Sequence, residues 1–487
     1  MSKCIKRYRY LAIIILLIFF ILTIFTSCSE KEPEPLRICI DIEYSVGCDT
    51  STLEADVDHL LITRLREACS LKGISAPRDL IVEYLPAKGE ERNIALQKIR
   101  TEIMAGGGPD LFIVACNEKN SELAEDALFT IPEKAMELNL FLTLDKYMDN
   151  ETHFAEWNKM NSIVLSAGRN NDGQQIIPMC YRIPVSVYEK TSVDCASSIE
   201  TTWMDMLSSD NIALAAAAIW TDNTAEYREG MPFIKNRAPM TEFILGKIAD
   251  FNEETLLFTE DELQQRLDEI IKLADRYSKG EFDTAPNHYV EYLGQSFDTP
   301  MQSTDIEGNK FDARNGITRE DDYAFIPLYS DDGGVTAEIT MYTAINRNTE
   351  RPEDAFLILD YLMSYSAQRS DRIYTSAVYT SYGIGSGIDS FSTGNLPMYD
   401  ALMSSSQRIY WVNPVVDNSA NGWYLSDHNF AELNKVRQQI THARFRSALD
   451  MELSKLYWDY LQAKQTKGDL EAIVSEGYNR MQRLLME

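Results

Sequence analysis

Residues 105–114, with the sequence Ala-Gly-Gly-Gly-Pro-Asp-Leu-Phe-Ile-Val, contain the junction that decides the fold. An amphipathic helical pattern over residues 90–105 runs into three glycines, which are strong helix-stop signals. Pro109-Asp110 then turns the chain, and the apolar residues 111–114 suit a short, buried parallel strand. The stretch therefore predicts a helix, a turn and a strand, which is the repeating unit of an α/β sheet.

The residues before this junction repeat the same pattern. Residues 36–42 alternate between apolar and polar like a strand, and residues 53–68 place apolar side chains at helical spacing. Residues 80–85 then form a second strand pattern ahead of the helix at 90–105. The order β-α-β-α-β predicts a doubly wound sheet, whose ligands bind beyond the carboxyl ends of the strands.

Beyond residue 196 the pattern becomes mostly helical. The remaining expected elements are a short inner strand at 213–219, a helix at 260–279, strands at 323–328 and 339–345, and a helix opened by Pro352. The last hundred residues are expected to be helical around a stretch at 410–424 that is rich in tryptophan and asparagine.

The N-terminus has the organisation of a secretory signal. Four basic residues in the first ten precede an apolar run of 15 residues at 11–25, short of the roughly 20 that span a bilayer as a helix. Thr26-Ser27-Cys28 follows, and a cysteine after two small residues resembles the lipobox of bacterial lipoproteins. We expect a signal peptide at 1–27, acylation of Cys28 and a solvated tether at 28–35, the alternative being an uncleaved signal anchor. The protein is therefore expected at the extracytoplasmic face of the cell membrane.

The net charge and the cysteine spacing limit the kinds of partner and of metal site that the chain can have. The chain has 46 basic and 75 acidic residues, a formal net charge of −29 spread along its length, which disfavours nucleic acid. Six of the eight cysteines lie outside the signal and the proposed anchor, within the first 200 residues. Export permits disulfides, but no pairing is assigned, and no Cys or Cys/His spacing indicates a metal site.

An ordered set of motifs gives the chain a family resemblance. In this order, the motifs are 105–112, then Asp172-Gly173-Gln174-Gln175-Ile176-Ile177-Pro178, then 327–334 before a strand and Asn346, then Arg351-Pro352-Glu353-Asp354-Ala355-Phe356, and terminal helices over 461–487. The set resembles bacterial extracellular solute-binding proteins of family 1, the family that includes maltose-binding protein.

The resemblance implies an α/β fold with two lobes, each a doubly wound sheet flanked by helices, joined by crossing strands that act as a hinge. It implies crossings near 180–185, Leu328 and Tyr374. The N-terminal lobe would comprise 36–183 and 329–374, and the C-terminal lobe 184–328 and 375–487. A monomeric, lipid-anchored protein would capture a polar solute, expected to be a carbohydrate, and deliver it to the transmembrane subunits of an ABC permease, without catalysis, cofactor or metal.

Matching the motifs also suggests ligand-binding residues, because sugar sites combine polar side chains with aromatic rings. They are Glu43 and Tyr44 after the first strand, Asn117 and Glu118 after the 111–114 strand, Tyr181 and Arg182 in the first crossing, Trp220 and Asp222 after the 213–219 strand, and Trp423.

Each of these residues also has a purely structural interpretation. Tyr44 suits a surface loop and Asn117 a helix N-cap. Trp220 and Trp423 suit packing, and Arg182 suits an ion pair between the lobes. Arg182 stands where an acidic residue serves neutral sugars in some relatives, which leaves an acidic sugar or another polar solute open.

Two other functions remain open from the sequence. A lipid-anchored glycoside hydrolase would need a pair of carboxylates, and with 75 acidic residues composition cannot exclude one. A sensor subunit would use the same closed shape to address a signalling receptor. No GxSxG serine, HExxH, Walker A or GxGxxG motif favours catalysis or nucleotide binding.

Overall fold

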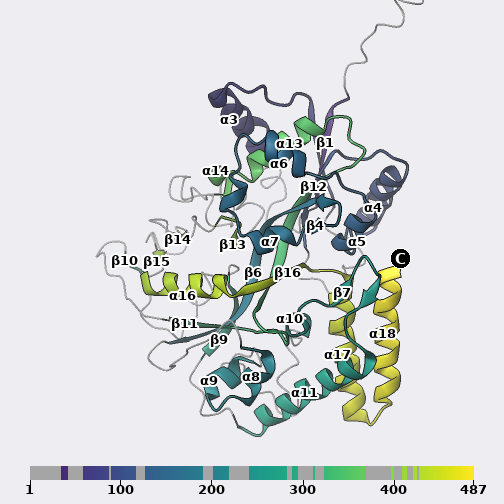
Figure 1. Ribbon diagram of the computed structural model, residues 1–487, viewed down its shortest axis with the longest axis vertical. Coiled ribbons are helices and arrows are strands. Elements are labelled where there is room, and N and C mark those ends of the chain that lie inside the picture. Colours follow the sequence, from purple (N-terminus) through teal and green to yellow (C-terminus); the bar gives the residue numbers. More distant parts are fainter. Residues whose placement is uncertain are drawn as a thin grey trace, which may run out of the picture. The chain divides into compact units, whose positions relative to one another are not determined.

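A long mixed sheet organises the chain (Figure 1). The structure, a computed structural model, describes residues 34–41, 59–86, 89–116, 127–189, 201–218, 241–281, 288–293, 311–312, 323–368, 396–399, 409–413, 421–424 and 427–486. In this part of the chain the sheet joins nine strands, six of them in the order β11-β6-β12-β3-β1-β2.

The N-terminal part of the sheet is parallel, as the sequence predicts. Strand β1 (Leu36–Asp41) lies between β2 (Leu80–Tyr84) and β3 (Leu111–Ala115) and pairs in parallel with both. The π-helix η1 (His59–Arg64) and helix α3 (Leu65–Lys72) connect β1 to β2, and α4 (Gly89–Met104) connects β2 to β3. The predicted β-α-β-α-β order is confirmed.

The glycine-rich junction after α4 ends the helix. Gly106 and Gly108 adopt φ angles of 84° and 100°, which favour glycine, and the N–H of Gly106 donates to the carbonyl of Ile103 at 3.0 Å. The Asn346 amide donates to the carbonyls of Gly107 and Pro109 at 2.8 and 2.9 Å. The motif at 105–112 and Asn346, far apart in the sequence, therefore hold one another at this end of β3.

Two long strands each belong to two parts of the sheet. Strand β12 (Val335–Ile345) is buried throughout and pairs in parallel with β16 (Ile440–Phe445) over residues 335–339, then antiparallel with β3 over residues 341–345. Strand β6 (Ile176–Glu189) pairs antiparallel with β12 near its start. From residue 183 onward β6 pairs with β9 (His288–Leu293), and from residue 185 also with β11 (Tyr323–Pro327). These are the crossing strands.

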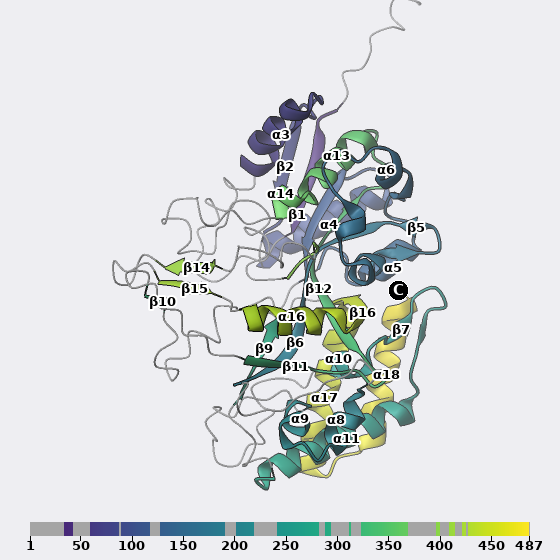
Figure 2. The same ribbon diagram turned by 60° about the vertical axis from the view of Figure 1, so that its left-hand side comes forward.

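Helices and short strands complete the described part. The remaining helices are α5 (Pro132–Glu137), α6 (Asp145–Asn150), η2 (Trp157–Lys159), α7 (Ser162–Ser166), α8 (Trp203–Ser208), α9 (Ile212–Ala217), α10 (Thr241–Leu245), α11 (Glu260–Ser278), α13 (Pro352–Leu362), α14 (Tyr365–Gln368), α16 (Asp427–Gln438), α17 (Ala448–Thr466) and α18 (Leu470–Met486). The short strands are β4 (Arg169–Asn170), β5 (Gly173–Gln174), β7 (Ala249–Asp250), β8 (Thr255–Leu256), β10 (Phe311–Asp312), β13 (Leu396–Pro397), β14 (Ile409–Asn413) and β15 (Asn421–Tyr424). Figure 2 shows α17 and α18 side by side near α11.

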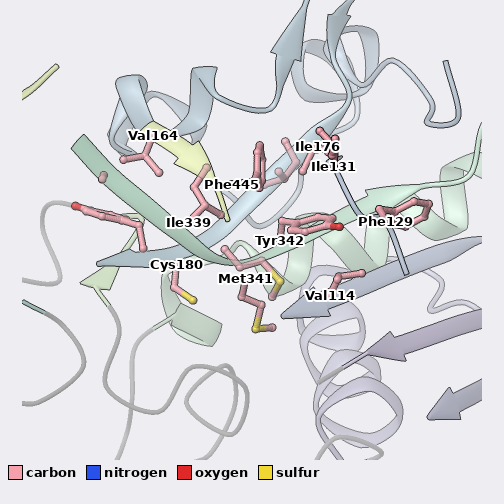
Figure 3. Packing of buried hydrophobic residues seen from close by; sticks show 14 of the residues in the cluster. Val114, Phe129, Ile131, Val164, Ile176, Cys180, Ile339, Met341, Tyr342 and Phe445 are labelled. Carbon is pink, nitrogen blue, oxygen red and sulfur yellow. The ribbon is translucent and has the colours of Figure 1, made fainter. Parts of the chain in front are cut away.

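The core lies where the crossing strands meet the parallel strands. Figure 3 shows Ile339, Met341 and Tyr342 of β12 among buried side chains from β3, β6 and β16. The ring of Tyr342 meets that of Phe445 edge-on, with centroids 5.2 Å apart. Such contacts between segments distant in sequence fix the place of β12 in the sheet.

The short inner strand predicted at 213–219 is wrong. Residues 212–217 form helix α9, and the Asn211 side chain caps it by accepting from the N–H groups of Ala213 and Leu214 at 3.1 and 3.4 Å. Alanine is the best helix former, and Asn at the N-cap stabilises the first turn. A short apolar run cannot be assigned from periodicity alone, so composition should have decided here.

The predicted lobe boundaries and the signal stay predictions. The crossings expected near 180–185 and Leu328 fall in β6 and directly after β11, whereas the one expected near Tyr374 lies outside the described residues. The signal at 1–27 and Cys28 also lie outside them. Within the part that the structure describes, every helix is too short or too polar to span a lipid bilayer.

Candidate functional site

The carboxyl ends of the parallel strands define one edge of the sheet. Because β1 and β3 are parallel neighbours, Asp41 and Ala115 end at the same edge, where ligands of such sheets bind. The predicted ligand residues Glu43, Tyr44, Asn117 and Glu118 follow directly, but all four lie outside the described residues, so their roles stay predictions.

A buried ion pair fixes the end of β1. Nη1 and Nη2 of Arg92, on α4, donate to the two carboxylate oxygens of Asp41 at 2.8 and 2.9 Å, and Nη1 also donates to the carbonyl of Pro86 at 2.9 Å. Both side chains are buried, so this two-pronged contact is geometrically demanding and orients the end of the strand. Sequence reasoning missed Arg92, whose only signal was a charge on the buried face of an amphipathic helix.

Arg182 lies in the crossing and pairs with Glu338. Its Nε donates to Oε1 of Glu338 on β12 at 2.9 Å, and its Nη2 contacts the same oxygen. The two residues are only 1% and 3% exposed. The ion-pair interpretation of Arg182 therefore has a partner in the structure, and Glu338 ties β6 to β12 just where both strands change partners.

Tyr181 is also buried and bonded in this structure. Its hydroxyl accepts a hydrogen bond from Nε of Arg437 on α16 at 2.9 Å. The Tyr329 hydroxyl, two residues after β11, donates to Oε1 of Gln439 at 2.5 Å, and the N–H of Val335 donates to the Gln439 carbonyl at 3.0 Å. The end of α16 is thus bonded to both crossing strands, and a ligand role for Tyr181 stays a prediction.

Two thiols flank the point where β12 changes partners. The N–H of Cys116 donates to the carbonyl of Thr340 at 2.8 Å, and the Thr340 hydroxyl lies 3.3 Å from the sulfur of Cys180. Burial, followed by the charge of Glu338, raises the pKa of the Cys116 thiol well above its usual value. Within the described ranges, no disulfide joins Cys39, Cys69, Cys116 and Cys180 to one another.

The remaining predicted site residues are not brought together by the described structure. Trp220 and Asp222 lie outside it, and the strand expected to present them is helix α9. Trp423 lies in β15, which pairs with β10 and β14 in a separate small sheet. In the described ranges no three His, Cys, Asp or Glu side chains are grouped to hold a metal ion.

Comparisons with known proteins define the fold class. No protein-family model matches the chain, and no curated protein matches its sequence. Solved structures do match. One is an extracellular solute-binding protein family 1 from Alicyclobacillus acidocaldarius, at 14% identity and a TM-score of 0.50, covering 94% of this chain and 100% of that one. Another is the sugar-binding protein MalE from Xanthomonas citri, at 14% identity and a TM-score of 0.51, covering 93% and 97%.

The chain therefore has the two-lobed α/β fold of periplasmic binding proteins, similar to family 1 solute-binding proteins. This confirms the predicted fold class. Strands β6 and β12 are the crossing strands of this fold, because each of them pairs in two parts of the sheet.

Proposed function

We propose that the protein is an extracytoplasmic solute-binding protein that captures a polar solute, a sugar or oligosaccharide, and delivers it to an ABC permease. The observation that carries the proposal is the pair of crossing strands, each of which pairs with two different parts of the sheet. Only a few backbone connections would then have to bend for two lobes to close around a solute.

The proposed binding region lies at the carboxyl edge of the parallel strands and along the crossing. Glu43, Tyr44, Asn117 and Glu118 would contribute from the loops after β1 and β3, and Tyr181 from β6. Trp220, Asp222 and Trp423 would face them from the C-terminal lobe. Arg182 would act indirectly, because its positive charge neutralises the buried carboxylate of Glu338 in the crossing.

The proposed anchor explains how such a receptor stays near its permease. Two or more acyl chains on Cys28 would hold it stably on the outer face of the membrane. Replacement of Cys28 by serine should release the protein into the medium, whereas replacement of Cys4, inside the proposed signal, should not. Equal retention of both variants would contradict the anchor and leave the binding proposal intact.

A thermal-shift screen tests the binding function. A ligand that binds only the folded state at 100 times its Kd stabilises that state by about 2.7 kcal/mol, which a melting curve resolves. We expect a mono- or oligosaccharide or a uronate to raise the melting temperature and to be recovered unchanged. A shift from amino acids alone would overturn the solute class, and release of shortened saccharides would overturn a role without catalysis.

A further inference from the structure

Residues 130–134, which we call the latch segment, contact elements that lie more than one hundred residues away in the sequence. The carbonyl of Thr130 accepts from the N–H of Ala448, at the start of α17, at 2.9 Å. Oε1 of Glu133 accepts from the N–H of Phe445, at the end of β16, at 3.3 Å. In the proposed domain division the latch segment belongs to the N-terminal lobe, and residues 444–448 belong to the C-terminal lobe.

Lys134 extends the same connection. Its ammonium group is buried, pairs with Oε1 of Glu254 at 2.8 Å, and donates to the carbonyl of Leu485 near the end of α18. A cation beside the last carbonyls of a helix complements its dipole. Neighbouring side chains on α5 thus reach β16, α18 and the turn between β7 and β8.

The latch segment also lies beside the point where β12 changes partners. Phe445 pairs with Ile339, the last residue of β12 on β16, and β12 pairs with β3 from Met341 onward. Glu133 therefore lies at a contact between the two proposed lobes, close to the point where β12 changes partners.

We propose that Glu133 makes the arrangement of the two lobes depend on pH, through the contact between the latch segment and residues 444–448. This goes beyond solute capture, and it rests on the proposed division into two lobes.

The surroundings of Glu133 favour its protonated form over its carboxylate form. Oε2 is buried and has no hydrogen-bond partner among the residues that the structure describes. Burial raises the pKa of Glu133 to about 7, against smaller opposing effects from the backbone N–H groups of Glu133 and Phe445 and from the charge of Arg444. The neutral acid suits this position, whereas the carboxylate is better solvated in water.

Other charged and titratable groups surround the position from each packed element. They are Arg444 on β16, paired with Asp450 on α17; Cys116 after β3; Tyr342 on β12; and Lys134 on α5, paired with Glu254. The pKa values of Cys116 and Tyr342 are raised by burial, so both groups stay neutral near pH 7. Arg444 and Lys134 each have an acidic partner, and His442, also on β16, pairs with Asp332 through its Nε2 at 2.9 Å. Glu133 is the carboxyl at this contact whose pKa burial raises into this range.

The sign and size of the effect follow from linkage. A carboxyl with a pKa of about 7 in the contact and its ordinary value of 4.5 when hydrated binds a proton more tightly in the contact. Raising the pH therefore favours separation of the latch segment. The equilibrium constant for separation should increase about 10-fold between pH 6 and pH 8.

Hydrogen exchange at the amides of Phe445 and Ala448 measures how often the contact between the latch segment and residues 444–448 opens. After correction for the intrinsic exchange rate, their protection should fall about 10-fold from pH 6 to pH 8 in the wild type. Glu133→Gln should remove this dependence, and Glu90→Gln, which alters an exposed carboxylate in the first turn of α4, should leave it unchanged. Equal pH dependence in the wild type and Glu133→Gln would overturn the proposal.

A second measurement applies even if Glu133→Gln does not fold. Carbon-13 titration of the side-chain carboxyls in the wild type should show Glu133 with a midpoint near 7, and a midpoint below 5 would overturn the proposal. Neither experiment uses a solute, so failure of the saccharide screen and failure of the pH dependence are distinguishable.

Discussion

Replacing Arg182 by methionine should destabilise the protein strongly, because it leaves the carboxylate of Glu338 buried opposite an uncharged side chain. The side chains of Arg182 and Glu338 are 1% and 4% exposed, so water cannot replace the lost charge. Removing one partner of a buried pair costs about 3–5 kcal/mol. Methionine retains much of the arginine's length, so most of this cost is electrostatic.

Chemical denaturation of two further variants separates the charge effect from packing. The double variant Arg182→Met/Glu338→Leu should recover most of the lost unfolding free energy, because neither charge of this buried pair remains. Lys159→Met removes a cation from an exposed pair with Glu156 and should cost less than about 1 kcal/mol. The reasoning is refuted if Arg182→Met lies within about 1 kcal/mol of the wild type, or if the double variant is no more stable than the single one.

Three further predictions concern stability. Gly477→Ala would place a Cβ 2.7 Å from Cδ1 of Leu456, so overpacking between α17 and α18 should lower the unfolding free energy, measured by urea titration, by about 1–3 kcal/mol. The control variant Gly107→Ala, whose Cβ would have no contact nearer than 3.7 Å, should lower it less. Asp360→Ala removes the carboxylate that accepts three backbone N–H groups of the loop after α6, at 2.7–3.0 Å, so proteolysis should cleave that loop faster than in the wild type. Because burial raises the pKa of Glu133 to about 7, its carboxyl binds a proton more tightly in the folded state than in the unfolded chain between pH 4.5 and 7. Glu133 should therefore lower the unfolding free energy by at most about 3 kcal/mol across that range, and that of Glu133→Gln should fall by that much less than in the wild type, keeping the part that Asp331 contributes because burial raises its pKa to about 6.

The order of elements up to residue 115 was predictable because local signals agree. Alternation in β1, helical periodicity before β2 and the glycines after α4 each act over a few residues. The alanine-rich run at 213–219 was assigned wrongly because a buried strand and a buried short helix have the same apolar pattern.

The contacts of the candidate site were only partly predictable. An ion pair was an open interpretation of Arg182, but its partner Glu338 lies 156 residues away, and nothing local connects them. The same holds for Glu133 and Phe445, which are 312 residues apart and meet in the folded chain next to the strand β12, which pairs with both β3 and β16. Such pairings depend on the register of long strands, which is set by tertiary packing.

Small-angle X-ray scattering during a saccharide titration tests the central claim most directly, because it reports solute capture and lobe closure in one experiment. We predict that a saccharide found in the thermal-shift screen reduces the radius of gyration in a saturable way and is recovered intact. Binding without any change in the radius of gyration, or conversion of the saccharide into shorter products, would contradict a two-lobed protein that captures its solute by closing.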